Sequence, residues 1–228
     1  MPVLNEAGTL PSSLSRLAAL RTRGHEVLVV DGDSLDRSRE RAAGLADRVL
    51  TAPRGRALQM NAGAAAARGD ALLFLHVDTR LPDEADRLIE VALAGGRGWG
   101  RFDVRLSGRH HLFRIIERMM NLRSRLTGIA TGDQAVFVRR ALFEAIGGFP
   151  PIPLMEDVAI SRRLKRAGGR PACVRVPVVT SSRRWERDGV LRTVLLMWRL
   201  RLAYALGADP AWLAARYYRT NFKRVRLD

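Results

Sequence analysis

The chain has 228 residues, of which 47% are hydrophobic and 27% charged, a composition that suits one globular domain and excludes a disordered chain. Its formal net charge of +16 comes almost entirely from arginine. This excess of positive charge can belong to a solvated basic surface, or it can bind a phosphate-bearing substrate or an anionic lipid. The sequence has no nucleic-acid-binding signature, a single cysteine (Cys173) and no apolar run of 18 residues, so no nucleic acid, disulfide framework or membrane-spanning helix is expected.

From residue 10 onward, helical patterns alternate with short apolar runs. Such alternation is typical of an α/β fold with a mixed, mostly parallel sheet between helices, in which ligands bind beyond the carboxyl ends of the strands. Residues 189–219 predict two further helices, broken at Gly207 to Pro210. The other helices are predicted over residues 10–23, 36–46, 56–68, 83–94, 110–126, 140–147 and 157–168. Strands are predicted over residues 26–33, 48–52, 70–78, 102–106, 133–140 and 172–182.

The first candidate site residue lies at the carboxyl end of a predicted strand. Asp31 ends the apolar run of VVDGDSLDRS (29–38), directly before Gly32, which permits a tight turn. A carboxylate in that place can accept hydrogen bonds from a base or a ribose. Ser34 and Asp36 are better explained as caps of the next helix. The dinucleotide fingerprint GxGxxG is absent here.

The run DALLFLHVD (70–78) ends in a second carboxylate, Asp78, two residues after His76. Carboxylate oxygens at a strand end suit Mg²⁺ or Mn²⁺, and an imidazole is a second candidate ligand or a hydrogen-bonding group. The alternative is that Asp78 or Thr79 caps the helix that begins near Pro82. These residues alone leave both explanations open.

Further charged residues lie at predicted helix starts and turns. Arg56 opens the small-residue helix RALQMNAGAAAA, where a guanidinium and backbone N–H groups suit a phosphate, while the alanines suit close helix–sheet packing. Asp133 follows a glycine before a predicted strand. Glu156 and Asp157 begin an amphipathic helix, either as partners of the helix dipole or with one as a general base that takes a proton from an attacking hydroxyl.

Two shorter motifs lie near the two ends of this region. PVLNEAGTL (2–10) ends a short strand, with Thr9 as a candidate helix cap and Glu6 either functional or incidental. SSRRWERDG (181–189) puts Arg184 beside Trp185, which suits a diphosphate and a sugar ring or simply the packing of an arginine over an aromatic ring.

Taken in order, these motifs resemble the family 2 glycosyltransferases of the GT-A fold. The family pattern runs P-x-x-N-E, V-V-D-x-x-S-x-D, R-x-x-x-x-N-x-G-x-x-x-A, D-x-D, a glycine-to-arginine segment followed by G-G-F, and E-D. Here it stands as PVLNE, VVDGDSLD, RALQMNAGAAAA, HVD, GDQAVFVRR with GGF, and MED, over residues 2 to about 185. The chain is also similar to the small bacterial "transferase 2" subgroup associated with radical-SAM and selenium-domain genes, also labelled arsenosugar-biosynthesis glycosyltransferases, which carries H-x-D-T and S-R-R-W. The resemblance implies a GT-A domain over residues 1–188 and an amphipathic helical extension over residues 189–228.

Carried over residue by residue, the resemblance implies a catalytic pair and a donor site. Asp157 is expected to be the catalytic base, with Glu156 beside it. Asp78 is expected to bind Mg²⁺ or Mn²⁺, with His76 where the family has its first aspartate. The implied mechanism is inverting, with an acceptor hydroxyl attacking in line while the metal-bound diphosphate leaves from the opposite face. The donor-binding positions are expected to be Pro2, Glu6, Asp31, Arg56, His76, Val77, Asp78, Asp133, Arg184 and Trp185.

Three positions depart from the family pattern. His76 replaces a carboxylate, which we expect to weaken metal affinity or to shift it toward Mn²⁺. Ser181 stands where processive members have the glutamine of Q-x-x-R-W, so processivity is not expected. Only Met1 precedes Pro2, whereas the family's first strand has several apolar residues there, so we expect a stunted strand, an upstream start or a truncated chain.

The arginine-studded helices of residues 189–219, with Trp198 and Trp212, have three candidate roles. They predict a position on an anionic membrane, a lid over the acceptor site, or a dimer contact. The expected location is the cytoplasm, with a peripheral place on the inner face of the cell membrane if the acceptor is lipid-linked. A nucleotidyltransferase is disfavoured, since no Gly- and Arg-rich loop with a lysine follows the first strand. A non-catalytic protein that binds a nucleotide-sugar or a membrane surface is the remaining alternative.

Overall fold

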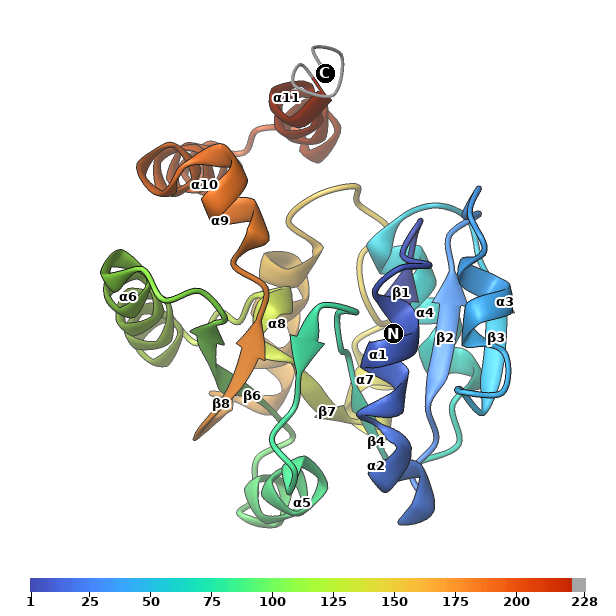
Figure 1. Ribbon diagram of the computed structural model, residues 1–228. Helices are drawn as coiled ribbons and strands as arrows, with labels where there is room; N and C mark the ends of the chain where they lie inside the picture. The colour runs from blue at the N-terminus through green and yellow to red at the C-terminus, as the bar shows by residue number, and fades with distance from the viewer. Residues whose placement is uncertain (223–228) are drawn as a thin grey trace.

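A computed structural model describes residues 1–222, which form two sheets surrounded by helices (Figure 1). The first sheet is parallel, in the order β1 (Pro2–Val3), β2 (Leu28–Asp31) and β3 (Arg48–Thr51). The second has the order β4-β7-β6-β8-β5, in which β6 and β8 are parallel and the other neighbours antiparallel. Its strands are β4 (Ala71–Leu73), β5 (Thr79–Arg80), β6 (Trp99–Leu106), β7 (Phe137–Arg139) and β8 (Ala172–Thr180). The predicted α/β class, with a parallel sheet flanked by helices, is therefore confirmed. The second sheet contains both parallel and antiparallel neighbours.

The helices lie on both sides of these strands, and the last ones gather above the second sheet (Figure 1). None of the helices within residues 1–222 is long and apolar enough to cross a bilayer. The helices are α1 (Leu10–Ser15), α2 (Ala18–Thr22), α3 (Ser38–Ala42), α4 (Arg56–Ala66), α5 (Ala85–Ala94), α6 (His111–Thr127), α7 (Arg140–Ala145), α8 (Glu156–Gly168), α9 (Arg183–Asp188), α10 (Val190–Ala205) and α11 (Pro210–Phe222).

The helix predicted over residues 10–23 is in fact two short helices, α1 and α2. Serine hydroxyls compete with the helical backbone there, since Ser12 Oγ donates to Thr9 O and Ser15 Oγ donates to Pro11 O. Thr9 makes no side-chain cap for α1, so its predicted capping role is wrong.

The strand predicted over residues 133–140 also begins late, at Phe137. The side chain of Thr131 accepts from the Gln134 backbone, and that of Gln134 accepts from the Thr131 backbone. This capping box closes a short 3-10 turn over Gly132–Gln134. Asp133 therefore lies on a turn and not in a strand.

Helix α4 packs closely on the parallel sheet, as its small residues predict. A Cβ built on Gly63 would lie 3.0 Å from Val30 Cγ2 in β2. The side chain of Asn61 donates to the carbonyl of Phe149 (2.9 Å) and accepts from its N–H (2.9 Å). The asparagine of α4 and the G-G-F segment are thus two halves of one structural contact.

Gly100 in β6 faces the tightest packing of the second sheet. A Cβ there would lie 2.4 Å from the Phe137 ring and 2.6 Å from the carbonyl oxygen of Ala172. We expect Gly100→Ala to lower the free energy of unfolding by about 1–3 kcal/mol, because the backbone cannot yield as a side chain can. Urea denaturation measures the change. The matched control is Gly8→Ala, where a Cβ meets nothing within 4 Å, and equal losses in both variants would contradict the prediction.

Candidate active site

The loops that follow β1 and β2 are locked together at the carboxyl edge of the parallel sheet. The Asn5 N–H donates to Ser34 Oγ (2.9 Å), and the Leu35 N–H donates to Asn5 Oδ1 (2.8 Å). The Glu6 N–H donates to Ser38 Oγ (2.8 Å). The N-E and D-x-x-S-x-D motifs therefore build one joint loop pair that positions Glu6 beside the end of β2.

Asp31 is fully buried at that end of β2. Its Oδ2 accepts from the Ser34 N–H (3.0 Å) and lies 3.5 Å from Arg39 Nε. Its Oδ1 has no hydrogen-bond partner within the described residues. Because buried carboxylate oxygens are nearly always hydrogen-bonded, this oxygen is a ready acceptor for a ligand N–H or O–H.

The N-cap position of α3 is Arg37 and has no side-chain cap, so the prediction that Ser34 or Asp36 is the cap is wrong, although Asp36 still binds the first N–H of the helix. Asp36 Oδ1 accepts from the Ser38 N–H at the start of α3 (3.0 Å), and its Oδ2 accepts from the Ala7 N–H (3.0 Å). The hydroxyl of Ser38 also donates to Asp36, and this hydrogen bond contributes most to holding the pKa of Asp36 below its usual value. The backbone hydrogen bonds add to the same effect. Asp36 is thus a structural residue.

Gln59 of α4 is a site residue that the sequence analysis missed. Its Nε2 donates to Val3 O and to Val30 O (2.8 Å each), so it joins the ends of β1 and β2. A Cβ on Gly32 would lie 2.8 Å from the Gln59 side chain, which explains the glycine after Asp31. A polar residue among small apolar ones in α4 was the available signal.

Asp78 lies near Glu6, between β4, which ends at Leu73, and β5, which begins at Thr79, so the strand predicted over residues 70–78 ends early. Burial raises the pKa of Glu6, and the negative charge of Asp78 adds to that rise. Asp78 itself is partly exposed and makes no side-chain hydrogen bond or ion pair within residues 1–222. Thr79 is in β5 and Glu84 is the residue before α5, so neither Asp78 nor Thr79 caps that helix.

His76 faces the turn that carries Asp133. Its Nδ1 lies 3.6 Å from Asp133 Oδ1, and a Cβ on Gly132 would lie 2.4 Å from its Cε1. Burial raises the pKa of Asp133, but the hydrogen bond from His76 and the positive charges of Arg56 and Arg184 leave it below the usual range. The imidazole therefore links the loop after β4 to the Asp133 turn.

Asp157 is held at the start of α8 by two backbone donors. Its Oδ2 accepts from the Gly132 N–H (3.2 Å), and its Oδ1 accepts from the Val158 N–H (2.7 Å). The neighbouring Glu156 is buried. Burial raises the pKa of Glu156 and the charge of Asp157 raises it further, while Arg56 opposes the rise. Two adjacent carboxyl groups thus differ in environment, a pattern typical of acid–base sites.

Arg56 lies among acidic and tyrosine side chains. Desolvation lowers its pKa, but Glu156, Tyr217 and Asp133 together raise it above the usual value. Its guanidinium remains positively charged at every physiological pH. These charged neighbours are the observation that supports the predicted position of Arg56 beside the site, which stays a prediction.

Backbone strain gathers in the same loops. Four non-glycine residues within the described chain have a positive φ: Asn5 (54°), Asp33 (67°), Ala135 (47°) and Met155 (68°). They lie in the loop after β1, the loop after β2, the Asp133 turn and the residue before α8. Such conformations cost free energy and are commonly kept where function requires them.

The C-terminal helices pack over the start of α8. Leu154 and Met155 belong to one buried cluster with Leu200 of α10 and Leu213 of α11. Arg184 of α9 donates a hydrogen bond to the hydroxyl of Tyr217, and its guanidinium lies 4.4 Å from that ring's centroid. The inner face of the extension therefore packs against the residues that lead into α8. The predicted lid role of the extension stays a prediction.

Three arginines near the start of the C-terminal helices or packed under them keep buried N–H groups without partners among the described residues, and one of them, Arg123, interacts with Asp157. Arg123 Nη2, Arg201 Nε and both Nε and Nη2 of Arg184 have no hydrogen-bond acceptor among the described residues. Burial lowers the pKa of Arg123 to about 10, and the positive charge of Arg201 contributes, while Asp157 opposes it. The sequence analysis missed Arg123 and Arg201, because nothing in a helical pattern marks which arginine turns inward.

Not every predicted site residue reaches this cluster. Pro2 pairs with Val30 in the sheet, so it positions the Glu6 loop. The side chain of Val77 is buried in the first core, which leaves only its backbone available, and its carbonyl accepts from Ser13 Oγ. Trp185 packs against the cluster of Leu106, Phe113 and Ile116 and supports α9 instead of facing Asp133.

The raised pKa of Glu156 predicts how the free energy of unfolding depends on pH. A folded-state pKa above the usual value of 4.5 means that the folded protein binds more protons, so stability falls as pH rises above that value. We expect Glu156→Gln to be more stable than the wild type at pH 7 and the difference to vanish as pH falls to about 4.5. Urea denaturation at both pH values measures it. A variant that is less stable at both would contradict the prediction.

Comparison with known proteins identifies the family to which this geometry belongs. The family model described as Glycosyl transferase family 2 matches residues 1–146. The chain belongs to glycosyl transferase family 2. The "transferase 2" subgroup assignment is untested by this match and stays a prediction.

Relatives of this family 2 chain carry a lipid phosphate in their names. An undecaprenyl-phosphate 4-deoxy-4-formamido-L-arabinose transferase of Pseudomonas paraeruginosa is 33% identical over 163 residues, which cover 64% of this chain and 48% of the relative. The chain thus spans about half the length of the curated relatives it matches.

Solved structures confirm the GT-A fold. S. aureus TarS (residues 1–349) has a TM-score of 0.65 at 18% identity, covering 100% of this chain and 72% of that one. Glucosyl-3-phosphoglycerate synthase from Mycobacterium tuberculosis, solved with Mn²⁺ and UDP-glucose, has a TM-score of 0.58 at 20% identity, covering 79% of this chain and 67% of that one. At these identities the likeness concerns the fold.

Proposed function

We propose that this family 2 chain is an inverting glycosyltransferase that moves a sugar from a nucleotide-diphosphate donor to an acceptor hydroxyl, with Asp157 as the general base. One observation carries the proposal. His76 contacts Asp133, and Gly132 next to it donates to Asp157, so that one turn connects the loop of Asp78 with the start of α8. A donor held by the first loop would therefore present its sugar to Asp157.

The nucleotide is proposed to lie at the joint loop pair. The unpaired Oδ1 of Asp31 suits a base N–H or a ribose hydroxyl, and Glu6 lies on the neighbouring loop, which is joined to Ser38. Arg56 and Arg184 supply positive charge around Asp133, where a diphosphate and the first sugar would sit. Pro2, Val77 and Trp185 support this site through the backbone and through packing.

A divalent metal fits the residues that are present. Within the described chain, no group of three or more His, Cys, Asp and Glu side chains could hold a metal ion alone. Asp78 offers one partly exposed carboxylate without a competing partner, and Mg²⁺ or Mn²⁺ is commonly bound by one or two carboxylates together with substrate phosphates. When bound, the metal would neutralise the charge of the leaving diphosphate. In this structure His76 is turned toward Asp133, so Asp78 is the stronger candidate ligand.

The chain's own residues supply the rest of the proposed chemistry. The Gly132 and Val158 N–H groups fix the Asp157 carboxylate, which takes the proton from the acceptor hydroxyl as the oxygen attacks the anomeric carbon. The C–O bond to the diphosphate breaks on the opposite face of the sugar, which inverts the anomeric centre. The α10–α11 lid limits water at that point, which protects the donor from hydrolysis.

The acceptor is proposed to carry a negative charge and to be lipid-linked. Arg123 is close enough to interact with Asp157 and with Arg201, and the unpaired N–H groups of these two arginines suit an acceptor phosphate. The named relatives are transferases for undecaprenyl phosphate, so this lipid probes the chain and the charge of the acceptor, while undecaprenol probes the hydroxyl that the proposed base requires. A lipid-linked acceptor makes a peripheral position at the inner face of the cell membrane the proposed location.

The test combines donor and acceptor screens on the purified chain with Mn²⁺ or Mg²⁺. Uridine, guanosine and thymidine diphosphate sugars are supplied with undecaprenyl phosphate or undecaprenol, and nucleoside diphosphate release and labelled lipid are measured. Metal-dependent transfer supports the proposal. Transfer to undecaprenyl phosphate that survives Asp157→Asn would make a phosphate oxygen the nucleophile and overturn the role of the base. A metal-dependent nucleotide complex without any transfer would favour the non-catalytic alternative.

A further inference from the structure

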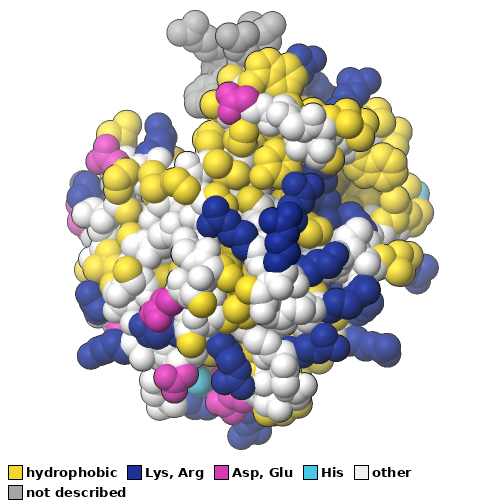
Figure 2. All heavy atoms as spheres, turned by 180° about the vertical axis from the view of Figure 1, so that it is seen from behind, with side chains coloured by type: hydrophobic (Ala, Val, Ile, Leu, Met, Phe, Trp, Pro, Cys, Tyr) yellow, Lys and Arg dark blue, Asp and Glu magenta, His cyan; other side chains and the backbone are white. Residues whose placement is uncertain are grey.

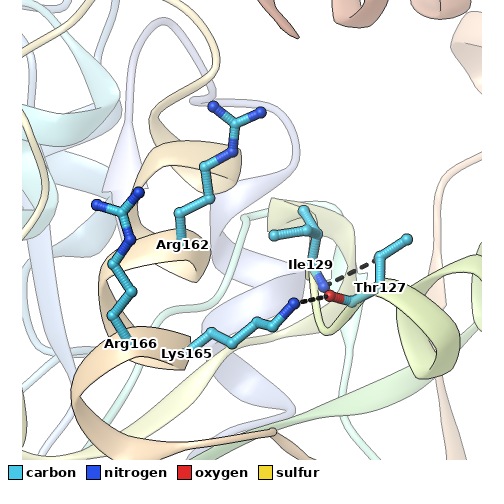
Figure 3. A pocket seen from close by; sticks show the side chains of 5 residues that line it. All are labelled: Thr127, Ile129, Arg162, Lys165 and Arg166. Carbon is cyan, nitrogen blue, oxygen red and sulfur yellow. Dashed lines mark hydrogen bonds between the residues drawn. The ribbon is translucent and has the colours of Figure 1, made fainter.

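A basic pocket lies between the end of α6 and the outer side of α8, and the proposed transfer chemistry does not use it. Its volume is about 430 Å³, and Thr127, Ile129, Arg162, Lys165 and Arg166 line it (Figure 3). Three of these side chains are cationic and none is acidic. A pocket that concentrates positive charge in this way suits an anion.

The cations of the pocket have no carboxylate partner within the described chain. Lys165 Nζ donates to the Thr127 carbonyl (2.9 Å), and the Arg162 guanidinium lies 5.3 Å from the Tyr204 ring centroid. Arg166 makes no ion pair among residues 1–222. Figure 3 shows Arg162 and Arg166 extending from α8 toward the same side, and a guanidinium group suits phosphate oxygens.

An exposed apolar stripe on α6 leads to this pocket. Four large hydrophobic residues recur at helical spacing and are between 47% and 67% exposed: Ile115, Met119, Leu122 and Leu126. The buried side of the same helix is supplied by Phe113 and Ile116. The stripe ends one residue before Thr127, which lines the pocket.

A second stripe runs along α10. Five residues at helical spacing are between 55% and 80% exposed: Leu191, Leu195, Trp198, Leu202 and Leu206. The stripe ends two residues beyond Tyr204, whose ring contacts Arg162 of the pocket. Figure 2 shows hydrophobic and basic side chains side by side on the upper part of one face of the molecule. Exposed apolar residues along whole helices mark an interaction surface, and basic neighbours are typical of helices that lie in a membrane interface.

We propose that this pocket binds the phosphate headgroup of an anionic membrane lipid while the stripes of α6 and α10 rest in the membrane interface. The pocket supplies the charge that a lipid phosphate requires, and the stripes supply the apolar surface that its acyl region requires. A soluble phosphate would leave the stripes without a partner. A second copy of the chain would bring two sets of arginines together, which is unfavourable.

Vesicle co-sedimentation with the full chain tests the proposal. The probes are vesicles of phosphatidylcholine alone and vesicles that contain one third phosphatidylglycerol. The variant Arg162→Gln/Arg166→Gln leaves Lys165 in place, because Lys165 holds the end of α6. The control Arg37→Gln/Arg41→Gln removes the same charge from two exposed arginines at the start and in the last turn of α3, on the far side of the molecule from α6 and α10 (Figure 1).

Wild type and control are expected to bind the anionic vesicles, and the pocket variant to bind them about 30-fold less tightly at low salt, given ~1 kcal/mol per basic residue at such a surface. If the pocket variant and the control lost vesicle affinity equally, the net charge of the chain would explain the effect, and the proposal would be overturned. Unchanged binding of a folded pocket variant, checked by circular dichroism, would overturn it too.

A second readout does not depend on the variant's stability. Brominated lipids are expected to quench tryptophan fluorescence in the wild type and to lose much of that effect in Trp198→Phe, because Trp198 lies on the α10 stripe. Glycerol phosphate in solution is expected to compete only weakly with vesicles, because it has no acyl region. Full displacement by glycerol phosphate would make the pocket a site for a soluble phosphate and contradict the lipid assignment.

Discussion

Asp157→Asn is expected to lower the rate of sugar transfer by about 10²–10⁴-fold while nucleotide binding stays intact, because an amide cannot accept the proton of the attacking hydroxyl. The amide oxygen can still accept one of the two hydrogen bonds from the Gly132 and Val158 N–H groups. The structural cost is then about one hydrogen bond, roughly 1 kcal/mol. Single-turnover kinetics with saturating donor measures the chemical step.

The matched control for this variant is Glu144→Gln, an exposed carboxylate on α7 that faces no site residue. Its rate is expected to stay within about twofold of the wild type. If Asp157→Asn also stayed within tenfold, the proton would have to leave by another route. Glu156 would be the next group to change, because it adjoins Asp157 and its raised pKa suits a proton carrier.

Asp78→Asn is expected to remove the metal-dependent part of nucleotide binding. In the wild type, a nucleoside diphosphate with Mn²⁺ at 100 times its dissociation constant would stabilise the fold by about 2.7 kcal/mol, seen as a rise in melting temperature. Without the carboxylate, the rise with Mn²⁺ is expected to equal the rise without it. Transfer is expected to fall by more than about 100-fold, since the diphosphate charge would lose its counter-ion.

The control for Asp78 is Asp83→Asn, an exposed aspartate five residues later in the same stretch. It carries the same change of charge, so a general electrostatic effect on an anionic donor would appear in both variants. A metal-dependent shift that persists in Asp78→Asn would move the metal to other ligands, and His76→Ala would then test the nearest candidate. The donor site and the metal site can thus be separated experimentally.

The placement of Asp31 and Asp78 was accessible from sequence because both follow short apolar runs that predict strands. The carboxyl ends of such strands are a common place for ligands in α/β folds. The paired motifs of the first two loops were also visible, although their cause was not. Only the structure shows that Asn5, Ser34 and Ser38 tie one loop to the other, while Asn61 joins α4 to Phe149.

Two predicted elements differ in the structure because hydrogen bonds from side chains to nearby backbone groups compete with the periodic pattern. A helical pattern over residues 10–23 did not predict the division into α1 and α2, next to which the hydroxyls of Ser12 and Ser15 donate to backbone carbonyls. An apolar run over residues 133–140 likewise predicted a strand, although the Thr131–Gln134 capping box turns the chain first. In both segments a side chain bonds to a backbone group a few residues away, and periodicity does not report such bonds.

The sequence by itself determined the α/β class, the family and the carboxylate of Asp31 at the end of β2, because apolar periodicity and short motifs are local properties of a chain. Only the tertiary structure decided which charged residues meet. Arg123, Arg201 and Tyr217 gather around the start of α8 although they come from α6, α10 and α11. The same packing left the stripes of α6 and α10 exposed. Which face of an amphipathic helix is covered depends on the helices that pack against it, and that choice is made across the whole chain.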